Sequence, residues 1–307
     1  MGINANVLRF LLRAKNDGVD FSRTAMIGRQ GLHLSFELFS HILNDEYQCD
    51  LDDAELKAIH ENFYAEKLFS YLGASLVHSF DYSDYEGATC VHDFNKPIPE
   101  NAKGQYTFVL DGGTLEHVFN FPIALKGCME MLAVGGSIVA TPPANNDMGH
   151  GFYQISPELY FAAFDESNGF YIDEIYITEG RETKAWYEVL NPKMVRKRAA
   201  LTNTRPTLLL VRASRQISVV IFERPPQQFD YITAWRDQSE SVTPMPVKKS
   251  RSWIRTILPS IVVRWLICLF SKALDLELRA RILTGISHDQ EVFKKVMMGK
   301  TKSRHPR

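Results

Sequence analysis

Side chains that can move protons or hold a charged ligand follow two short apolar segments, residues 106–110 and 137–140. Glu116 and His117 come shortly after the first segment, and His150 lies in the polar loop after the second. Histidine titrates near neutral pH and is well suited to act as a general base. We therefore predict an enzyme in which His150 is the preferred base. His117 is the other catalytic candidate, with orientation of a cofactor or substrate as its alternative role.

The two apolar segments are predicted strands joined by a helix over residues 114–132, with a Gly135-Gly136 turn before the second strand. A strand, a helix and a second strand at this spacing form a βαβ unit, whose strands are parallel neighbours in one sheet. Because both strands then end at the same edge, their polar loops should meet where open α/β sheets bind ligands.

Similar patterns recur on both sides of this unit. Further strands are predicted at residues 24–28, 75–80, 88–91, 170–178, 207–212 and 217–222, and helices at 3–16, 34–44, 51–71 and 156–166. The last two strands are close enough in sequence to pair as an antiparallel hairpin. The predicted fold is an α/β three-layer sandwich with a Rossmann-like, mostly parallel sheet, an antiparallel edge and a helical C-terminal extension.

The chain divides by composition into three parts, residues 1–224, 225–250 and 251–307. The first is the predicted α/β domain, the second is a linker rich in proline, glutamine and serine, and the third is a basic, apolar helical extension. Residues 225–307 carry 15 Lys and Arg against 7 Asp and Glu, whereas residues 1–224 carry 20 against 29. The extension therefore suits an anionic membrane surface or a protein partner, with a solvated positive face as the alternative.

Cysteine usage and charge distribution limit the other classes of function. The four cysteines lie far apart and form no CxxC pair, which favours a reducing compartment over a disulfide framework or zinc ribbon. We expect a cytoplasmic protein, either free or peripheral to the membrane. No cluster has the sequence spacing of metal ligands, so no metal is predicted. Nothing beyond the basic tail suggests nucleic acid as a partner. The oligomeric state is left open.

From residue 24 onward, the order of these signals resembles the class I S-adenosylmethionine-dependent methyltransferases. The sequence LEHV at 115–118 resembles the LEH signature of small-molecule methyltransferases, and LAVGGS at 132–137 resembles the turn into their fifth strand. The resemblance implies S-adenosylmethionine as cofactor. It also implies cofactor-binding positions after the first four strands, which are Gly28, Gln30, Asp81, Tyr82, Asp93, Phe94, Asp111, Gly112 and Glu116.

One loop departs from the pattern of this family, and another resembles the loop of a subgroup. The family's first strand ends in an acid and a G-x-G-x-G loop, but here the corresponding residues are Gly28-Arg29-Gln30-Gly31, so the glycine loop is degenerate. Helical insertion around residues 34–60 would explain the long separation of Gly28 from Asp81. The loop at 145–159 resembles that of bacterial methyltransferase-like proteins associated with sugar and polysaccharide pathways.

The resemblance implies a methyltransferase that acts on a small acceptor, such as a sugar or a polysaccharide-pathway intermediate. Within the 145–159 loop, Asn145, Asn146 and Tyr153 are the candidates for binding that acceptor. The alternative is an inactive methyltransferase-like scaffold that acts through its C-terminal extension, as the degenerate glycine loop would allow. A dinucleotide enzyme is weaker still, because no G-x-G-x-x-G follows the first strand.

Overall fold

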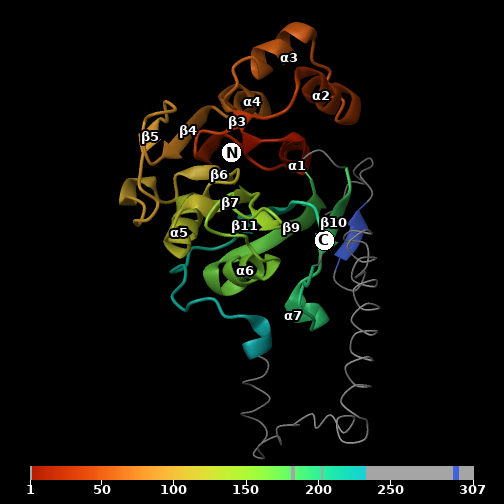
Figure 1. Cartoon of the computed structure of the whole chain (residues 1–307). Helices are drawn as coiled ribbons and strands as arrows, with labels where there is room; N and C mark the ends of the chain where they lie inside the picture. Colours follow the sequence, from red (N-terminus) through yellow and green to blue (C-terminus); the bar gives the residue numbers. More distant parts are fainter. Residues whose placement is uncertain (1, 181–183, 202, 233–292, 297–307) are drawn as a thin grey trace, which may run out of the picture.

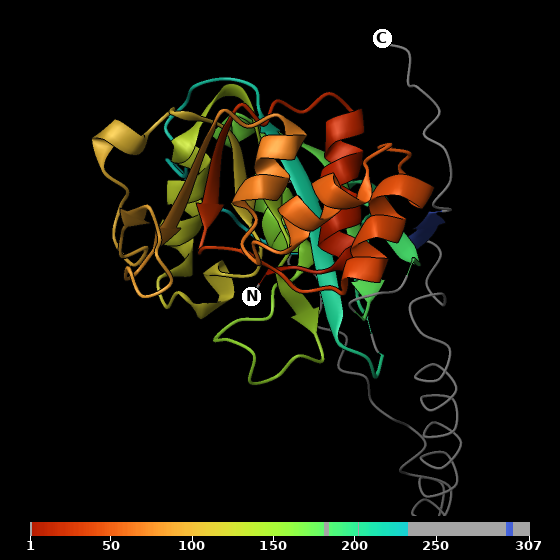
Figure 2. The ribbon, with the colours of Figure 1, turned by 90° about the horizontal axis from the view of Figure 1, so that it is seen from above.

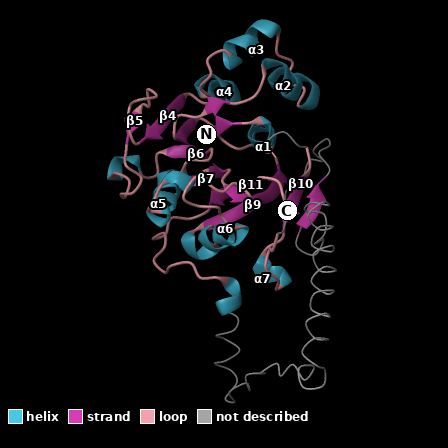
Figure 3. Ribbon diagram, in the orientation of Figure 1, coloured by secondary structure: helices cyan, strands magenta, loops and turns pink. Residues whose placement is uncertain are grey.

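The computed structural model describes residues 2–180, 184–201, 203–232 and 293–296. Its strands are β1 (Gly2–Ile3), β2 (Arg23–Ile27), β3 (Gly31–Leu32), β4 (Leu76–Asp81), β5 (Cys90–Val91), β6 (Tyr106–Asp111), β7 (Leu132–Ala140), β8 (Pro143–Asn145), β9 (Phe170–Glu179), β10 (Trp186–Val189), β11 (Thr207–Arg215) and β12 (Phe293–Val296). Its α-helices are α1 (Ala5–Asn16), α2 (Phe36–Ser40), α3 (Asp53–His60), α4 (Glu66–Leu72), α5 (Phe121–Met131), α6 (Pro157–Ala163) and α7 (Pro192–Val195). Helices cover both faces of one large sheet (Figure 1, Figure 3).

Within the described residues the large sheet has the order β12-β10-β9-β11-β7-β6-β2-β4-β5, and β8 pairs with β11. The strands from β7 to β5 are parallel neighbours. The other half is antiparallel, because β11 opposes both β7 and β9, and β10 opposes both β9 and β12. The predicted Rossmann-like α/β sheet with an antiparallel edge is confirmed.

In the parallel half of the sheet, the order in which the strands are added reverses between β2 and β6, although these two strands run in the same direction. The chain builds outward from β2 through β4 to β5, then returns to the other side of β2 to form β6 and β7. This is the doubly wound arrangement, whose ligands bind in the crevice beyond the carboxyl ends of the strands at the reversal. The end of β2 at Ile27 pairs with the end of β6 at Asp111, so the two following loops start side by side.

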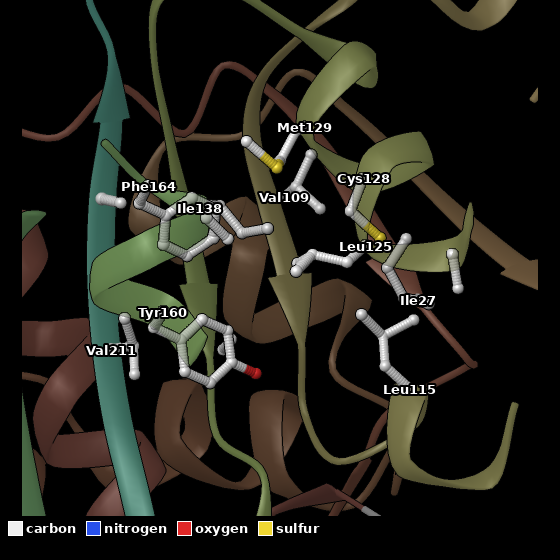
Figure 4. Packing of buried hydrophobic residues seen from close by; sticks show 14 of the residues in the cluster. Ile27, Val109, Leu115, Leu125, Cys128, Met129, Ile138, Tyr160, Phe164 and Val211 are labelled. Atoms are coloured by element: carbon white, nitrogen blue, oxygen red, sulfur yellow. The ribbon is translucent and has the colours of Figure 1, made fainter. Parts of the chain in front are cut away.

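Buried apolar side chains lie on both faces of the central strands. In β6, Val109 belongs to the cluster under α5 and α6, whereas Phe108 and Leu110 belong to the cluster under α1 and α4. Figure 4 shows Val109 with Leu125 of α5 and Tyr160 of α6. Successive residues of a strand point to opposite faces, so a strand buried on both sides must be apolar throughout. This double burial produces the three layers.

The N-terminal segment lies at the ligand edge of the sheet. Gly2 pairs in parallel with Gly31, which follows the end of β2. The Asn4 side chain then accepts hydrogen bonds from the backbone N–H groups of Asn6 and Val7 and so starts α1. In Figure 2, the N-terminus and the yellow-green loop that follows β8 lie on the same side of the sheet. The sequence patterns gave no sign of the β1–β3 pair.

The helical insertion expected around residues 34–60 is present as α2, a π-helix (His41–Glu46) and α3. The prediction of one helix over 51–71 is wrong, because α3 ends at His60 and α4 begins only at Glu66. The break includes Phe63, whose φ of 56° lies in the left-handed region and cannot continue a helix.

Two other predictions about local structure are wrong. Residues 217–222 form no strand, because β11 already has neighbours on both edges and the N–H groups of Gln216 and Ile217 donate instead to the Gly169 carbonyl. The helix predicted over 114–132 is interrupted, with a 3-10 turn at Leu115–His117 and α5 starting at Phe121. Proline in the first turn of α5 suits a helix start, because that position needs no N–H donor.

The predicted linker and C-terminal extension lie largely outside the described residues. Within the first part of the linker, the Glu158 carboxylate of α6 accepts hydrogen bonds from the backbone N–H of Phe229 and the side chain of Gln228. Of the predicted helical extension, residues 293–296 form the strand β12. No helix of the described part of the chain is long and apolar enough to cross a membrane. The proposed division into three parts stays a prediction.

Candidate active site

Asp111, at the carboxyl end of β6, is fully buried and shapes the turn that follows it. Its Oδ1 accepts hydrogen bonds from the backbone N–H groups of Thr114 at 2.8 Å and Leu115 at 3.3 Å. Its Oδ2 is buried without a hydrogen-bond partner among the described residues. Burial disfavours the charged carboxylate and raises the pKa of Asp111 to about 6. Oδ1 of this carboxylate therefore stabilises the turn, while Oδ2 accepts no hydrogen bond from the described residues.

Glu116 lies in the 3-10 turn after β6 and its side chain is completely buried. Neither carboxylate oxygen has a hydrogen-bond partner among the described residues. Burial, and then the charge of Asp111, raise the pKa of Glu116 to about 8. A buried carboxylate that accepts no hydrogen bond costs free energy. Such a group is a candidate functional residue because its pKa suits proton transfer near neutral pH.

Two histidines complete a cluster with Glu116. The Nε2 atom of His150 lies 3.5 Å from Glu116 Oε1, and Nε2 of His117 lies 3.9 Å from the same oxygen. Burial, and then the charge of His150, lower the pKa of His117. The structure therefore brings together both predicted catalytic histidines and the carboxylate predicted to bind cofactor. The sequence suggested no such triad, because His150 comes from a separate loop.

Gln30 follows β2 and occupies the reversal point of the sheet. Its Nε2 donates to the Ile27 carbonyl at 2.5 Å and to the Thr114 hydroxyl at 3.1 Å. Its Oε1 is buried and has no hydrogen-bond partner in the described part of the chain. A Cβ added to Gly112 would lie 2.5 Å from this oxygen, so Gly112 permits the close approach of Gln30. Gln30 and Gly112, both predicted cofactor residues, are in contact.

The rest of the loop after β2 is held by its own contacts. Gly28 has a φ of 72°, which suits glycine, and an added Cβ there would meet Thr114 Oγ1 at 2.7 Å. The Arg29 guanidinium contacts Glu66 at 2.7 Å and lies 3.9 Å from the centre of the Tyr64 ring. It also donates to the Glu86 carbonyl. Arg29 therefore ties together the loops after β2 and β4.

The residues predicted to bind cofactor after β4 and β5 have mixed surroundings. Asp81 ends β4 and accepts a hydrogen bond from the backbone of Tyr82, whose side chain is exposed. Asp93 accepts two hydrogen bonds from Asn95, which lower its pKa. Phe94 is 5% exposed and packs near Phe80, which gives its ring a place in the hydrophobic core. The predicted contact of Phe94 with the cofactor stays a prediction.

The predicted acceptor-binding side chains bond within the protein. Asn145 and Asn146 donate through their amide groups to Asn203, and Asn146 also donates to the Arg205 carbonyl. The Tyr153 hydroxyl donates to the Phe119 carbonyl at 2.7 Å. These contacts hold the loop after β7 in place. Their expected role in binding the acceptor stays a prediction.

A pocket of about 160 Å³ lies beside the buried carboxylates. Glu116, His150, Gly112 and Gly113 line it, together with residues the sequence analysis missed, which are Gly2, Asn4, His33, Thr141, Pro143, Asp147 and Leu208. Segments that are far apart in the sequence therefore line the same pocket. The one available sequence signal was that Thr141 and Pro143 directly follow a predicted strand, at the edge where ligands bind.

No family model matches the chain, and no curated protein matches it. It is similar to the structure of a putative methyltransferase from Bacillus halodurans C-125, with 10% identity, a TM-score of 0.39, and 69% of this chain and 100% of that chain covered. It is also similar to a putative S-adenosylmethionine-dependent methyltransferase from Listeria monocytogenes, with 15% identity, a TM-score of 0.35, and 68% and 99% covered. A branched-chain polyamine synthase from Thermus thermophilus shows 13% identity, a TM-score of 0.35, and 72% and 60% covered. At these TM-scores the similarities carry no argument about function.

Proposed function

We propose that the chain is an S-adenosylmethionine-dependent methyltransferase that acts on a small acceptor. The observation that carries this proposal is a group of unsatisfied acceptor atoms at the reversal of the doubly wound sheet. They are Gln30 Oε1, Asp111 Oδ2 and both carboxylate oxygens of Glu116, all buried without hydrogen-bond partners among the described residues. Since unpaired buried acceptors are costly, the group favours a ligand that brings donors or positive charge.

S-adenosylmethionine has the chemistry to satisfy these atoms. Its sulfonium is positively charged, and its amino acid end carries an ammonium group with three N–H donors. Gln30 is fixed through its amide nitrogen, so its Oε1 is presented as an acceptor next to Gly112. In this proposal, the Gln30 side chain replaces the backbone approach that a G-x-G-x-G loop would give, and Gly28 shapes the turn before it.

The nucleoside end would extend toward the loops after β4 and β5. There Asp81 and Asp93 are the proposed acceptors for ribose and adenine groups. One Asp81 oxygen accepts from the Tyr82 backbone, which leaves the second oxygen available for a hydroxyl group. Asp93 is already engaged with Asn95 and Lys96, so we assign it the weaker contact.

The transfer itself needs alignment and, for a hydroxyl acceptor, removal of a proton. His150 is 31% exposed in its side chain and lines the pocket, so a substrate can reach it. Buried Glu116, 3.5 Å away, would in its ionised form stabilise the protonated imidazole that forms when His150 accepts the proton. A sugar or a polysaccharide-pathway intermediate, with its many hydroxyl groups, is the acceptor class we propose.

Calorimetric titration with S-adenosylmethionine and S-adenosylhomocysteine tests the cofactor assignment. Gln30→Ala and Asp81→Ala should each weaken binding by about 10- to 100-fold, as expected for the loss of a buried hydrogen bond or a charge-assisted one. Asp53→Ala, at an exposed site in the first turn of α3, is the matched control and should bind like the wild type.

Absence of binding by the folded wild-type protein would refute the proposal. That result would favour the alternative of an inactive scaffold. One observation supports this second candidate, which is that Arg29 is held by Glu66, Tyr64 and the Glu86 carbonyl across the loops where a nucleoside would lie.

A further inference from the structure

Glu116, His117 and His150 present three ligand atoms to one point. One atom from each side chain, a carboxylate oxygen or an imidazole nitrogen, lies within 4.8 Å of the others. Both imidazole Nε2 atoms lie near the same oxygen, Oε1 of Glu116, at 3.5 Å and 3.9 Å. In a tetrahedral site with bonds of 2.0–2.1 Å, ligand atoms are about 3.4 Å apart. The separations therefore need only small side-chain adjustments to surround an ion.

The hydrogen-bonding state of these atoms points independently to a ligand. Glu116 is 0% exposed, and neither of its oxygens has a hydrogen-bond partner among the described residues. The Nε2 atom of His117 is likewise buried without a partner in that part of the chain. Buried carboxylates that accept no hydrogen bond are rare in protein interiors because they lose hydration without full compensation. A bound cation would supply the compensation.

The backbone holds the two contributing segments together. The Glu116 carbonyl accepts hydrogen bonds from the N–H groups of Phe152 at 2.8 Å and Tyr153 at 3.2 Å. Between them and His150 lies Gly151, where an added Cβ would be 2.9 Å from both the carbonyl oxygen and Cγ of Glu116. The loop that carries His150 is therefore fixed against the turn that carries Glu116 and His117, as a preorganised ligand set requires.

We propose that Glu116, His117 and His150 bind a divalent first-row transition ion such as Zn²⁺ or Fe²⁺. Two imidazoles and one carboxylate favour these ions, whereas Mg²⁺ prefers oxygen ligands. Three protein ligands leave coordination positions open, as in catalytic metal sites. Glu116 and His150 also line the pocket, so a substrate in it can reach the ion. The proposal replaces the expectation from sequence spacing that no metal would bind.

This site has a chemical consequence that rests on the proposed function. A metal ion lowers the pKa of a bound oxygen ligand. A hydroxyl group of the acceptor, bound to the ion, would lose its proton to solvent. Its oxygen would then form the new bond to the methyl carbon while the bond from that carbon to the sulfonium sulfur breaks, leaving a neutral thioether. Glu116 and His150 would then act as metal ligands. Gln30 Oε1 and Asp111 Oδ2 would remain as acceptors for the cofactor, and His150 would not be the general base.

The test uses the full-length protein after treatment with a chelator and without S-adenosylmethionine, so its result does not depend on the proposed function. Titration with Zn²⁺ by calorimetry and with Co²⁺ by visible absorption should show one ion per chain, with millimolar Mg²⁺ failing to compete. Glu116→Gln and His150→Ala should each weaken binding by roughly 100-fold, at least as much as removing an outer hydrogen-bond partner of a ligand costs.

His41→Ala is the matched control, because His41 also lies beside two carboxylates, Asp45 at 2.6 Å and Glu46 at 3.4 Å, but is exposed on the π-helix. This variant should bind the ions like the wild type. Far-ultraviolet circular dichroism and thermal unfolding establish that each variant is folded. The proposal is refuted if the folded wild type binds neither ion at micromolar concentration. It is equally refuted if folded Glu116→Gln and His150→Ala bind as tightly as the wild type, or if only His41→Ala loses binding.

Discussion

Gly151→Ala should separate the loop of His150 from Glu116. The added Cβ would lie 2.9 Å from the Glu116 carbonyl oxygen, which is closer than Cβ atoms approach in proteins, and 3.2 Å from the carbonyl carbon, which is tighter than most such contacts. Because these are backbone atoms, a side-chain rotation cannot relieve the overlap. The loop must move, and the hydrogen bonds from Phe152 and Tyr153 to the Glu116 carbonyl must lengthen or break.

The magnitude follows from these contacts. Overpacking a well-packed site costs about 1–3 kcal/mol. The two hydrogen bonds contribute about 1 kcal/mol each, and part of this loss is already included in that range. We therefore expect the free energy of unfolding to fall by about 2 kcal/mol. The separation of His150 from Glu116 should grow as well, which would weaken Zn²⁺ binding by at least tenfold.

Gly149→Ala is the matched control two residues earlier. Gly149 has a φ of 87°, so alanine there carries backbone strain, but an added Cβ would meet nothing within 4 Å. Urea denaturation should show a loss of about 1 kcal/mol for this variant, the cost of a Cβ in the left-handed region, with Zn²⁺ affinity close to that of the wild type. The reasoning is refuted if Gly151→Ala binds Zn²⁺ like the wild type, or if Gly149→Ala weakens binding to the same extent.

Three further changes test the energetics of buried polar groups. Burial and the charge of Asp111 raise the pKa of Glu116 from its ordinary value of 4.5 to about 8, so ionisation of Glu116 opposes folding. The free energy of unfolding therefore falls as the pH rises from 4.5 to 8. In chelator, Glu116→Gln should thus be more stable than the wild type by roughly 2–5 kcal/mol at pH 8.5 and near equal at pH 4.5; urea denaturation showing no pH-dependent gain would contradict this. Arg9→Met should lower the free energy of unfolding by about 2 kcal/mol, because Arg9 is 1% exposed and pairs twice with Glu46, which keeps Lys184 at 2.8 Å as its remaining partner; a loss under 1 kcal/mol in the same assay would refute it. Tyr160→Phe should raise stability by about 1 kcal/mol, because the buried hydroxyl has no hydrogen-bond partner among the described residues; a lower thermal unfolding midpoint would count against it.

Most of the parallel half of the fold could be predicted from local patterns. Strands buried on both faces must be apolar throughout, and this is why residues 106–110 predicted β6 and residues 137–140 predicted the buried half of β7. The turn expected at Gly135-Gly136 is wrong, because β7 already begins at Leu132, which pairs with Tyr106 of β6. The prediction failed where neighbours decided the outcome. Residues 217–222 have apolar character but no strand edge to pair with, since β11 lies between β7 and β9.

In the candidate site too, some features could be predicted from local sequence and others depend on distant segments. Local sequence placed Asp111, Glu116 and His117 in one turn, because they directly follow a strand and the turn is closed by hydrogen bonds to Asp111 itself. Asn145 and Asn146, for which binding of the acceptor stays a prediction, contact Asn203, more than 50 positions away. Turn chemistry could not reveal that partner, because the contact depends on how β8 pairs with β11.

The sequence by itself determined the class of fold and the chemical groups at the ligand edge, because strand burial and turn formation depend on residues within a few positions of one another. Only the tertiary structure decided which groups meet. Gln30 reaches Gly112 because β2 and β6 pair in parallel, and His150 reaches Glu116 because its loop returns to the Glu116 carbonyl. Such contacts arise from sheet pairing and loop closure between distant segments, so no local pattern in the sequence specifies them.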